Sequence, residues 1–344
     1  MITDAPETIR CGNPACRVAD TGKCIEGLET AICPSYGKAP DSLVNDLHDA
    51  EPPTEVAAIV FSLAQKLTIP ETIELLRKRQ SRVVAIIGPH KAGKTSLIAS
   101  IHDLFQEGPI GSFEFAASST LHAFEEASHD SRMESGRESP DTKRTQRGGV
   151  GFYHLDIGHN KTQECITLLL GDRAGEEYLE AADDIELMQE LEEVERADVI
   201  TLLADGMRLL DVGDRHNVIS QIERILQVLQ DANVLTGRQK LVLVMTKLDT
   251  VQDAKDDKVA ARALQDFSKL KTDVMRKYTS VFESINSFQI AASPKSKTLM
   301  PGEGMTELLS CWLMPRKCQT VDLPVHIVPT RAIGRLALRR KKGE

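Results

Sequence analysis

The residues best suited to chemistry lie in one short stretch, residues 86–101, which reads IIGPHKAGKTSLIASI. Within it Gly88, Gly93, Lys94 and Thr95 satisfy the spacing G-x-x-x-x-G-K-[ST]. In such a loop, backbone N–H groups and the positive end of the next helix cradle phosphates, the lysine reaches the β- and γ-phosphates, and the threonine hydroxyl ligates Mg²⁺. The stretch therefore predicts nucleotide binding but does not identify the base.

Three later motifs narrow the choice of base. LLLGDRAGEEY places Asp172 and Gly175 after an apolar run, VMTKLD ends the next but one such run, and IAASPK ends the one after that. Asp249, the last residue of VMTKLD, can accept hydrogen bonds from both N1–H and N2–H₂ of guanine, a pair that adenine does not offer. The motifs together predict a guanine nucleotide.

The segments that must position these motifs alternate between strand and helix patterns. Apolar, β-branched runs predict six strands, at RVVAIIG, GGVGFYHLDI, TQECITLLLGD, ADVITLLAD, KLVLVMTKLD and SFQIAAS. Helical spacing separates them at residues 95–106, 176–196, 215–231, 257–277 and 303–313. This alternation predicts an α/β fold with a doubly wound, mostly parallel six-stranded sheet and with ligands at the carboxyl ends of the strands.

The order and placement of the motifs resemble those of a P-loop GTPase of the translation-factor-related class, which includes the Ras-like small GTPases. The resemblance covers residues 82 to about 314. It implies a Ras-like G domain that hydrolyses GTP to GDP and phosphate. It further implies that Asp172 supports Mg²⁺ through the metal's water shell and that the N–H of Gly175 meets the γ-phosphate. The nucleotide contacts predicted in this way are Gly88, His90, Lys91, Ala92, Gly93, Lys94, Thr95, Ser96, Gly175, Thr246, Lys247, Asp249, Ala292 and Ser293.

Two positions depart from the family pattern. Thr246 replaces the usual asparagine, so an amide that braces the phosphate loop is lost and a lower nucleotide affinity is expected. In the last loop the family uses a backbone N–H to bind guanine O6, and aligning SPK with the family's Ser-Ala-Lys would put Pro294, which has no N–H, at that position. A register shifted by one, with Ala292 and Ser293 in the loop, restores a donor at Ser293 and is preferred.

Two side chains, Glu176 and Lys91, are candidates for the hydrolytic step besides Lys94, and His90 lies next to Lys91 in the motif. Glu176 stands where many small GTPases carry the glutamine that orients the attacking water, although an acid in the first turn of a helix is also favoured by the helix dipole. Lys91 occupies the loop position at which guanylate-binding proteins carry an internal arginine finger; the alternative is a solvent-facing lysine. His90 falls beside the expected path of the water, where it would crowd a finger inserted by a partner.

Mg²⁺ is expected to bind Thr95, Asp172 and one threonine of a mobile switch. That switch should lie within the polar segment 118–148, which shows no strand pattern and is predicted to be a long loop insert. Thr145 is the preferred ligand because it closely precedes a strand, with Thr142 second and Thr120 a distant third.

The chain outside residues 82–314 divides into three segments. Residues 1–50 form a cysteine-rich module, residues 54–80 a helical linker with Thr68 and Pro70 suited to a helix start, and residues 315–344 a basic tail. The tail is either a solvated terminus or a docking segment for an acidic partner or a membrane surface.

Four cysteines of the first segment, Cys11, Cys16, Cys24 and Cys33, have the spacing C-x₄-C-x₇-C-x₈-C. Four thiolates suit tetrahedral Zn²⁺, but no C-x₂-C pair is present. A structural zinc site and a set of partly buried thiols are both open, with an iron–sulfur cluster third.

The formal net charge of −9 argues against general nucleic-acid binding, no apolar run is long enough to cross a bilayer, and the start of the chain lacks a secretory pattern. A cytoplasmic protein is expected.

The combination of motifs, insert and cysteines resembles bacterial double-GTPase conflict-system proteins, which implies a second GTPase or an effector as partner and a part in defence against phage. The expected function is a GTP-hydrolysing switch; the alternatives are a GTP-dependent scaffold with negligible hydrolysis and, disfavoured by Asp249, an ATPase or kinase.

Overall fold

The computed structural model describes residues 11–12, 16–24, 27–37, 65–131, 145, 147–294 and 299–315. The chain divides into two compact units, residues 1–61 and residues 62–344. Among the described residues of the first unit, a single helical turn, α1 (Val18–Thr21), ends at Gly22 in the left-handed conformation. An isolated β-bridge pairs Cys11 with Tyr36.

The second unit is built on a seven-stranded sheet in the order β2-β3-β4-β1-β5-β6-β7. β4, β1, β5, β6 and β7 are parallel, and β2 and β3 continue the sheet with antiparallel pairing. The strands are β1 Ser81–Ile87, β2 Phe113–Ala117, β3 Gly151–His159, β4 Cys165–Asp172, β5 Val199–Asp205, β6 Lys240–Thr246 and β7 Ser284–Gln289. The predicted α/β class is confirmed, but the count of six strands is wrong. The missed strand is β2, an edge strand with mostly exposed side chains that leaves no buried apolar pattern in the sequence.

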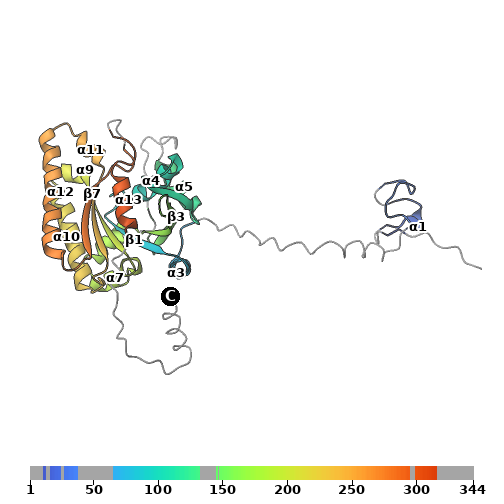
Figure 1. Ribbon diagram of the computed structural model, residues 1–344, viewed down its shortest axis with the longest axis horizontal. Coiled ribbons are helices and arrows are strands. Elements are labelled where there is room, and N and C mark those ends of the chain that lie inside the picture. Colours follow the sequence, from blue (N-terminus) through green and yellow to red (C-terminus); the bar gives the residue numbers. More distant parts are fainter. Residues whose placement is uncertain are drawn as a thin grey trace, which may run out of the picture. The chain divides into compact units, whose positions relative to one another are not determined.

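Helices cover both faces of the sheet. One apolar cluster packs the helices between β4 and β7 against one face, and a second packs α4, α5 and α13 against the other. Figure 1 shows α10 and α12 on one side of the strands and α13 and α4 on the opposite side. The helices of this unit are α3 Ile69–Lys78, α4 Lys94–Glu107, α5 Leu121–Ser131, α6 Gly175–Ala181, α7 Ile185–Gln189, α8 Glu192–Glu195, α9 Gly206–Leu210, α10 Arg215–Asp231, α11 Leu248–Gln252, α12 Asp257–Tyr278 and α13 Met305–Leu313.

Two predicted segments differ from the structure in their helices. The single helix expected over residues 176–196 is three short helices, α6 to α8, because the Asp184 carboxylate accepts from the N–H groups of Glu186 and Leu187 and starts a new helix. The loop expected over residues 118–148 begins with helix α5, which packs on α4 and places Phe124 in the core.

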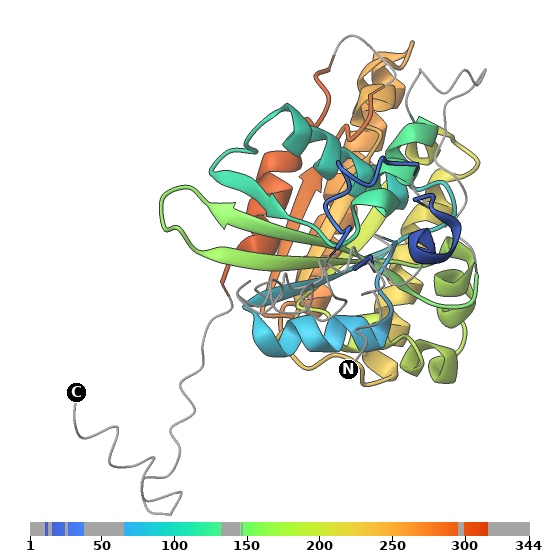
Figure 2. The same ribbon diagram turned by 90° about the vertical axis from the view of Figure 1, so that its right-hand side faces the viewer.

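The segment predicted as a linker packs on the sheet. Thr68 and Glu71 form a capping box at the start of α3, and Leu67 pairs with Phe152 of β3 through two backbone hydrogen bonds. Leu67, Leu75 and Leu76 join Phe152 in a small apolar cluster. Figure 2 shows α3, in cyan, on the side of the strands opposite to α4 and α5. Residues 54–64 of the predicted linker lie outside the described residues, as do Thr142 and residues 316–344 of the predicted tail.

Across the described parts of the chain, no helix has the length and apolar character to span a bilayer.

The packing of α13 on the sheet yields a test of the core. The Nε1–H of Trp312, the one tryptophan of the chain, donates to Thr201 Oγ1 at 3.0 Å, and both side chains are fully buried. Thr201→Val keeps the volume but leaves the indole N–H without this acceptor, so it should lower the free energy of unfolding by roughly 1–3 kcal/mol. Urea unfolding followed by Trp312 fluorescence measures it. Thr162→Val, in an exposed turn, should change the free energy by less than about 0.5 kcal/mol, and equal stabilities for the two variants would contradict the expectation.

Candidate functional site

The phosphate-binding loop lies between β1, which ends at Ile87, and α4, which begins at Lys94. Gly93 caps the helix with φ 91°, a left-handed conformation that favours glycine. A Cβ at Gly88 would lie 3.0 Å from Leu203 Cβ, so this glycine lets the loop pass close to β5. Lys91 also has a positive φ, 63°, and its side chain is exposed. The strand–loop–helix context predicted for the loop is confirmed.

Lys94 is held inside the loop. Its Nζ donates to the carbonyl oxygens of Gly88 at 2.8 Å and Pro89 at 3.1 Å, and the residue is buried. The pKa of Lys94 is lowered from its ordinary value because burial disfavours the charged form. The nearby carboxylates of Asp172 and Glu176 oppose this effect without cancelling it. The loop thus carries a positive charge fixed by its own backbone, at the place where the motif puts the phosphates.

Three oxygen-bearing side chains meet beside the loop. Thr95 Oγ1 lies 3.3 Å from Thr145 Oγ1, and Thr145 Oγ1 lies 3.3 Å from Asp172 Oδ2. Two hydroxyls and one carboxylate are hard donors of the kind that Mg²⁺ prefers, so this set fits the predicted metal. The structure brings together the three residues predicted for magnesium.

The structure separates the candidate switch threonines. Thr145 is at the site, whereas Thr120 is fully buried, where its hydroxyl accepts from the N–H of His154 at 2.9 Å, a packing role that removes it as a metal ligand. The segment after Thr145 is tied to α6: Arg147 pairs with Glu180, and Gly148 N–H donates to Glu177 at 3.2 Å.

Gly175 packs directly on the phosphate-binding loop. A Cβ there would lie 2.5 Å from the backbone nitrogen of His90 and 2.8 Å from the carbonyl oxygen of Gly88. The next residue, Glu176, places a carboxylate oxygen 3.8 Å from His90 Nδ1. His90 of the loop and Glu176 of α6, the predicted catalytic carboxylate, therefore face each other, and both side chains are partly exposed. A hydrogen-bond acceptor and an imidazole stand at the mouth of the loop.

The predicted base-binding loops are adjacent. The N–H of Leu248 donates to the carbonyl oxygen of Ile290 at 3.0 Å, which joins the TKLD loop to the loop that carries Ala292 and Ser293. Asp249 is buried in α11. The register that makes Ser293 the donor to guanine stays a prediction.

Thr246 corrects one expectation. Its Oγ1 donates to the carbonyl oxygen of Ala92 at 2.9 Å, so the threonine braces the phosphate-binding loop although it lacks the amide of the family's asparagine. The short hydroxyl side chain reaches the loop because the loop passes close to it. A Cβ at Gly93 would lie only 3.8 Å from the Cβ of Thr246. The brace that the sequence indicated as lost is therefore present.

Sequence reasoning missed several charged residues that shape the site. Asp205, at the end of β5, holds Lys247 Nζ at 2.7 Å, and its position after an apolar run was a readable signal. Arg173 forms two hydrogen bonds with the buried carboxylate of Glu193, at 2.7 and 3.0 Å, and Tyr178 donates to the same carboxylate at 3.1 Å. Glu193 lies 20 residues from Arg173 in sequence, and no local pattern connects them.

The four clustered cysteines are partly exposed in the first unit. Within the described ranges, no group of three or more His, Cys, Asp or Glu side chains could hold a metal ion. The geometry gives the zinc prediction no support.

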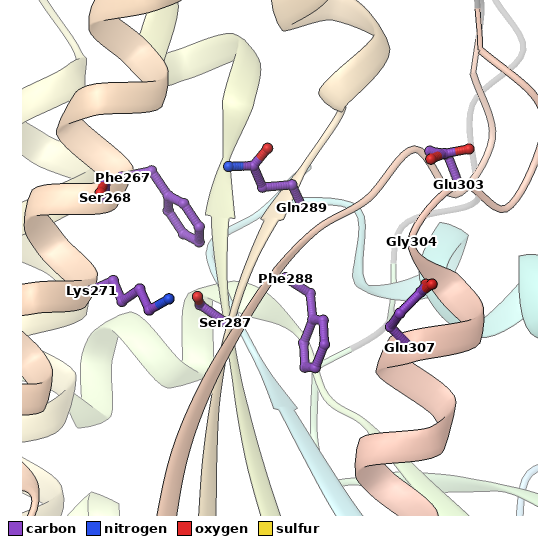
Figure 3. A pocket seen from close by; sticks show the side chains of 9 residues that line it. All are labelled: Phe267, Ser268, Lys271, Ser287, Phe288, Gln289, Glu303, Gly304 and Glu307. Carbon is purple, nitrogen blue, oxygen red and sulfur yellow. The ribbon is translucent and has the colours of Figure 1, made fainter.

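A separate hollow of about 450 Å³ lies at the β7 edge of the sheet, between α12 and α13. Figure 3 shows Lys271 and Ser287 facing each other on one side, with Phe288 on the side of Glu307. None of the residues predicted to bind nucleotide lines this hollow.

The fold and the loops at the carboxyl edge of its sheet define a P-loop G domain. The chain matches the Double-GTPase 2 family over residues 82–313 and belongs to that family.

Two solved structures are similar to this chain at low sequence identity. The signal recognition particle receptor SRβ–GTP/SRX complex from Chaetomium thermophilum is 16% identical, with 64% of this chain and 94% of that chain covered and a TM-score of 0.36. The GTP-bound GTPase-like domain of Ski7 from S. cerevisiae is 16% identical, with 74% and 54% covered and a TM-score of 0.38. No curated protein sequence matches the chain.

The brace on the phosphate-binding loop is testable. Thr246→Val removes the donor to Ala92 but keeps the shape of the side chain, so nucleotide affinity should fall by roughly fivefold, the effect of one hydrogen bond. Titration with a fluorescent GDP analogue measures the affinity. Thr246→Ser, which keeps the hydroxyl, is the matched control and should bind as the wild type does. Equal affinity in the valine variant would show that the hydrogen bond contributes nothing to binding.

Proposed function

We propose that this protein is a molecular switch that binds GTP and hydrolyses it to GDP. The observation that carries the proposal is the meeting of Thr95, Thr145 and Asp172 at the mouth of the phosphate-binding loop, beside Gly175. These residues come from α4, from the segment before β3, from β4 and from the start of α6. A γ-phosphate and its metal would touch all four, so its loss would release two chain segments together.

Base selection in this proposal rests on the TKLD loop. Asp249 accepts from the N1–H and N2–H₂ of guanine, Lys247 is oriented by its ion pair with Asp205, and Thr246 ties the loop to the phosphate site. The backbone N–H of Ser293 donates to guanine O6.

Two groups of this chain take part in the hydrolytic step, one at the γ-phosphoryl group and one at the attacking water. Lys94 stabilises charge that develops on the phosphoryl oxygens, and Glu176, beside His90, accepts the proton of the attacking water. Thr95, Thr145 and Asp172 would hold magnesium, which would supply further positive charge to the same oxygens. Lys91, exposed at the tip of the loop, adds a cation in cis.

We further propose that the switch acts in the cytoplasm with a protein partner, a second GTPase or an effector, in a bacterial system against phage. The support is the resemblance of the motifs to double-GTPase conflict systems and the membership in the Double-GTPase 2 family.

Base selection has a decisive test. Asp249→Asn should lower GDP affinity by about a hundredfold because two hydrogen bonds to a charged acceptor are lost or weakened. The same variant should gain affinity for xanthosine diphosphate, whose C2 carbonyl can accept from the new amide. Competition against a fluorescent GDP analogue measures both. Asp257→Asn, on the exposed first turn of α12, is the control and should leave both affinities unchanged. Wild-type protein that binds ADP as tightly as GDP would overturn the assignment of guanine.

The hydrolytic role of Glu176 is tested by single-turnover kinetics. Glu176→Ala should slow GTP cleavage by roughly 10²-fold or more, as expected for loss of a general base, with GTP affinity little changed. Glu190→Ala, exposed at the end of α7, should cleave GTP at the wild-type rate. Unchanged cleavage in the Glu176 variant would remove this role, and negligible cleavage by the wild type with and without partners would favour a GTP-dependent scaffold.

Lys91→Ala, assayed alongside, should also slow cleavage at normal GTP affinity. Normal turnover would make Lys91 a solvent-facing loop residue.

A further inference from the structure

Asp172 carries an ion pair that the nucleotide motifs do not account for. Lys66 Nζ lies 2.7 Å from Asp172 Oδ2, and the Asp172 side chain is completely buried while that of Lys66 is one-third exposed. Thr145 Oγ1 lies 3.3 Å from the same carboxylate oxygen. Lys66 precedes the region that matches the family, residues 82–313. An ammonium group from outside the matched region therefore sits on the carboxylate predicted to support magnesium.

The backbone around Lys66 is fixed, so the contact is not that of a freely moving surface lysine. The next residue, Leu67, exchanges two hydrogen bonds with Phe152, at 2.8 and 2.9 Å, and Thr68 caps α3. Both constraints follow Lys66 directly in the chain, which sets where its side chain starts.

The path of the side chain is also built for a lysine. A Cβ at Gly151 would lie 2.7 Å from Lys66 Cδ, so only a glycine leaves room for the stem on that side. The ammonium group then lies 4.9 Å from the centre of the Tyr153 ring, a distance at which a cation is attracted by the ring face. Gly151 and Tyr153 thus direct the charge to Asp172.

A buried carboxylate that loses its partner is costly, because it has been taken out of water. Lys66 meets this need without a metal. Magnesium would meet it too, and two cations at one carboxylate repel each other, more strongly in a buried site than in water.

We propose that Lys66 is a resident counter-cation of the magnesium site, which competes with Mg²⁺ for Asp172 and is displaced from it when magnesium and nucleotide bind. The inference rests on the proposed function, because it concerns the metal that accompanies the nucleotide. Because Lys66 competes with Mg²⁺, a higher Mg²⁺ concentration is needed for the protein to retain nucleotide. It also keeps the folded site neutral at Asp172 when magnesium is scarce.

The test is the Mg²⁺ dependence of nucleotide retention in the full-length chain. The rate at which a fluorescent GDP analogue is released is measured as a function of free Mg²⁺. Lys66→Met keeps an unbranched stem but removes the charge, and it should lower the Mg²⁺ concentration of half-maximal retention by about tenfold. Lys66→Arg should stay near the wild-type midpoint. Lys78→Met removes an exposed lysine from α3 and should leave the midpoint unchanged.

A second variant tests the same contact without changing the lysine. Gly151→Ala places a methyl group on the path of the Lys66 stem and should shift the Mg²⁺ midpoint in the same direction as Lys66→Met. A readout independent of nucleotide is the thermal midpoint in a chelator, without nucleotide: Lys66→Met should melt earlier than the wild type there, and the difference should shrink with Mg²⁺ and GDP.

The outcomes separate two failures. An unchanged or raised Mg²⁺ midpoint in Lys66→Met, in protein that binds GDP, would overturn the competition while the proposed function stands. Wild-type protein that binds no guanine nucleotide at any Mg²⁺ concentration would overturn the proposed function and this inference with it.

Discussion

The buried carboxylate of Asp172 lies at the carboxyl ends of the central strands, where the loops of the site begin. It ends β4, and β4 pairs in parallel with β1, whose own end carries the phosphate-binding loop. A buried negative charge is unfavourable unless cations and hydrogen-bond donors surround it. Lys66 pairs with this carboxylate, the Thr145 hydroxyl donates to it, and Thr95 lies beside Thr145. The nucleotide site is in this sense organised around one charge as much as around one loop.

The rest of the site follows from strand register. Asp205 and Thr246 are direct neighbours across the β5–β6 pair, so one residue orients Lys247 while the other holds the phosphate-binding loop. The loop that follows β7 is joined to the loop that follows β6 by the Leu248–Ile290 hydrogen bond. The phosphate-binding loop is therefore tied to the loop after β6 by the Thr246 hydroxyl, and the loop after β6 is tied to the loop after β7 by a backbone hydrogen bond.

Residues with local signatures were predictable from the sequence. The G-x-x-x-x-G-K-T loop, Asp172 with Gly175, and the TKLD loop each depend on spacing within a few residues, and the parallel strands before them are strongly apolar. Thr145 could be chosen over Thr120 because it lies close to a strand, and the structure shows the buried role that occupies Thr120.

Features that depend on distant parts of the chain could not be read. The pairing of Arg173 with Glu193 and of Lys66 with Asp172 joins residues 20 and 106 positions apart. The edge strand β2 and helix α5 have few buried apolar residues, so β2 was not predicted and α5 was included in the predicted loop 118–148. The brace by Thr246 was missed because a comparison of side-chain chemistry at one position ignores how closely the loop approaches it.

The bridge between Leu67 and Phe152 has a consequence for where this G domain begins. β2 pairs with β3 only from Asp156 to His159. Leu67 forms an antiparallel bridge with the same strand at Phe152. Leu67 thus adds one isolated β-bridge to β3, and Lys66, the residue before it, neutralises the central carboxylate. A fragment cut at the boundary of family similarity would lose both contributions at once. For this chain the folded unit and the region that matches the family have different starting points, and the difference lies in residues 65–80.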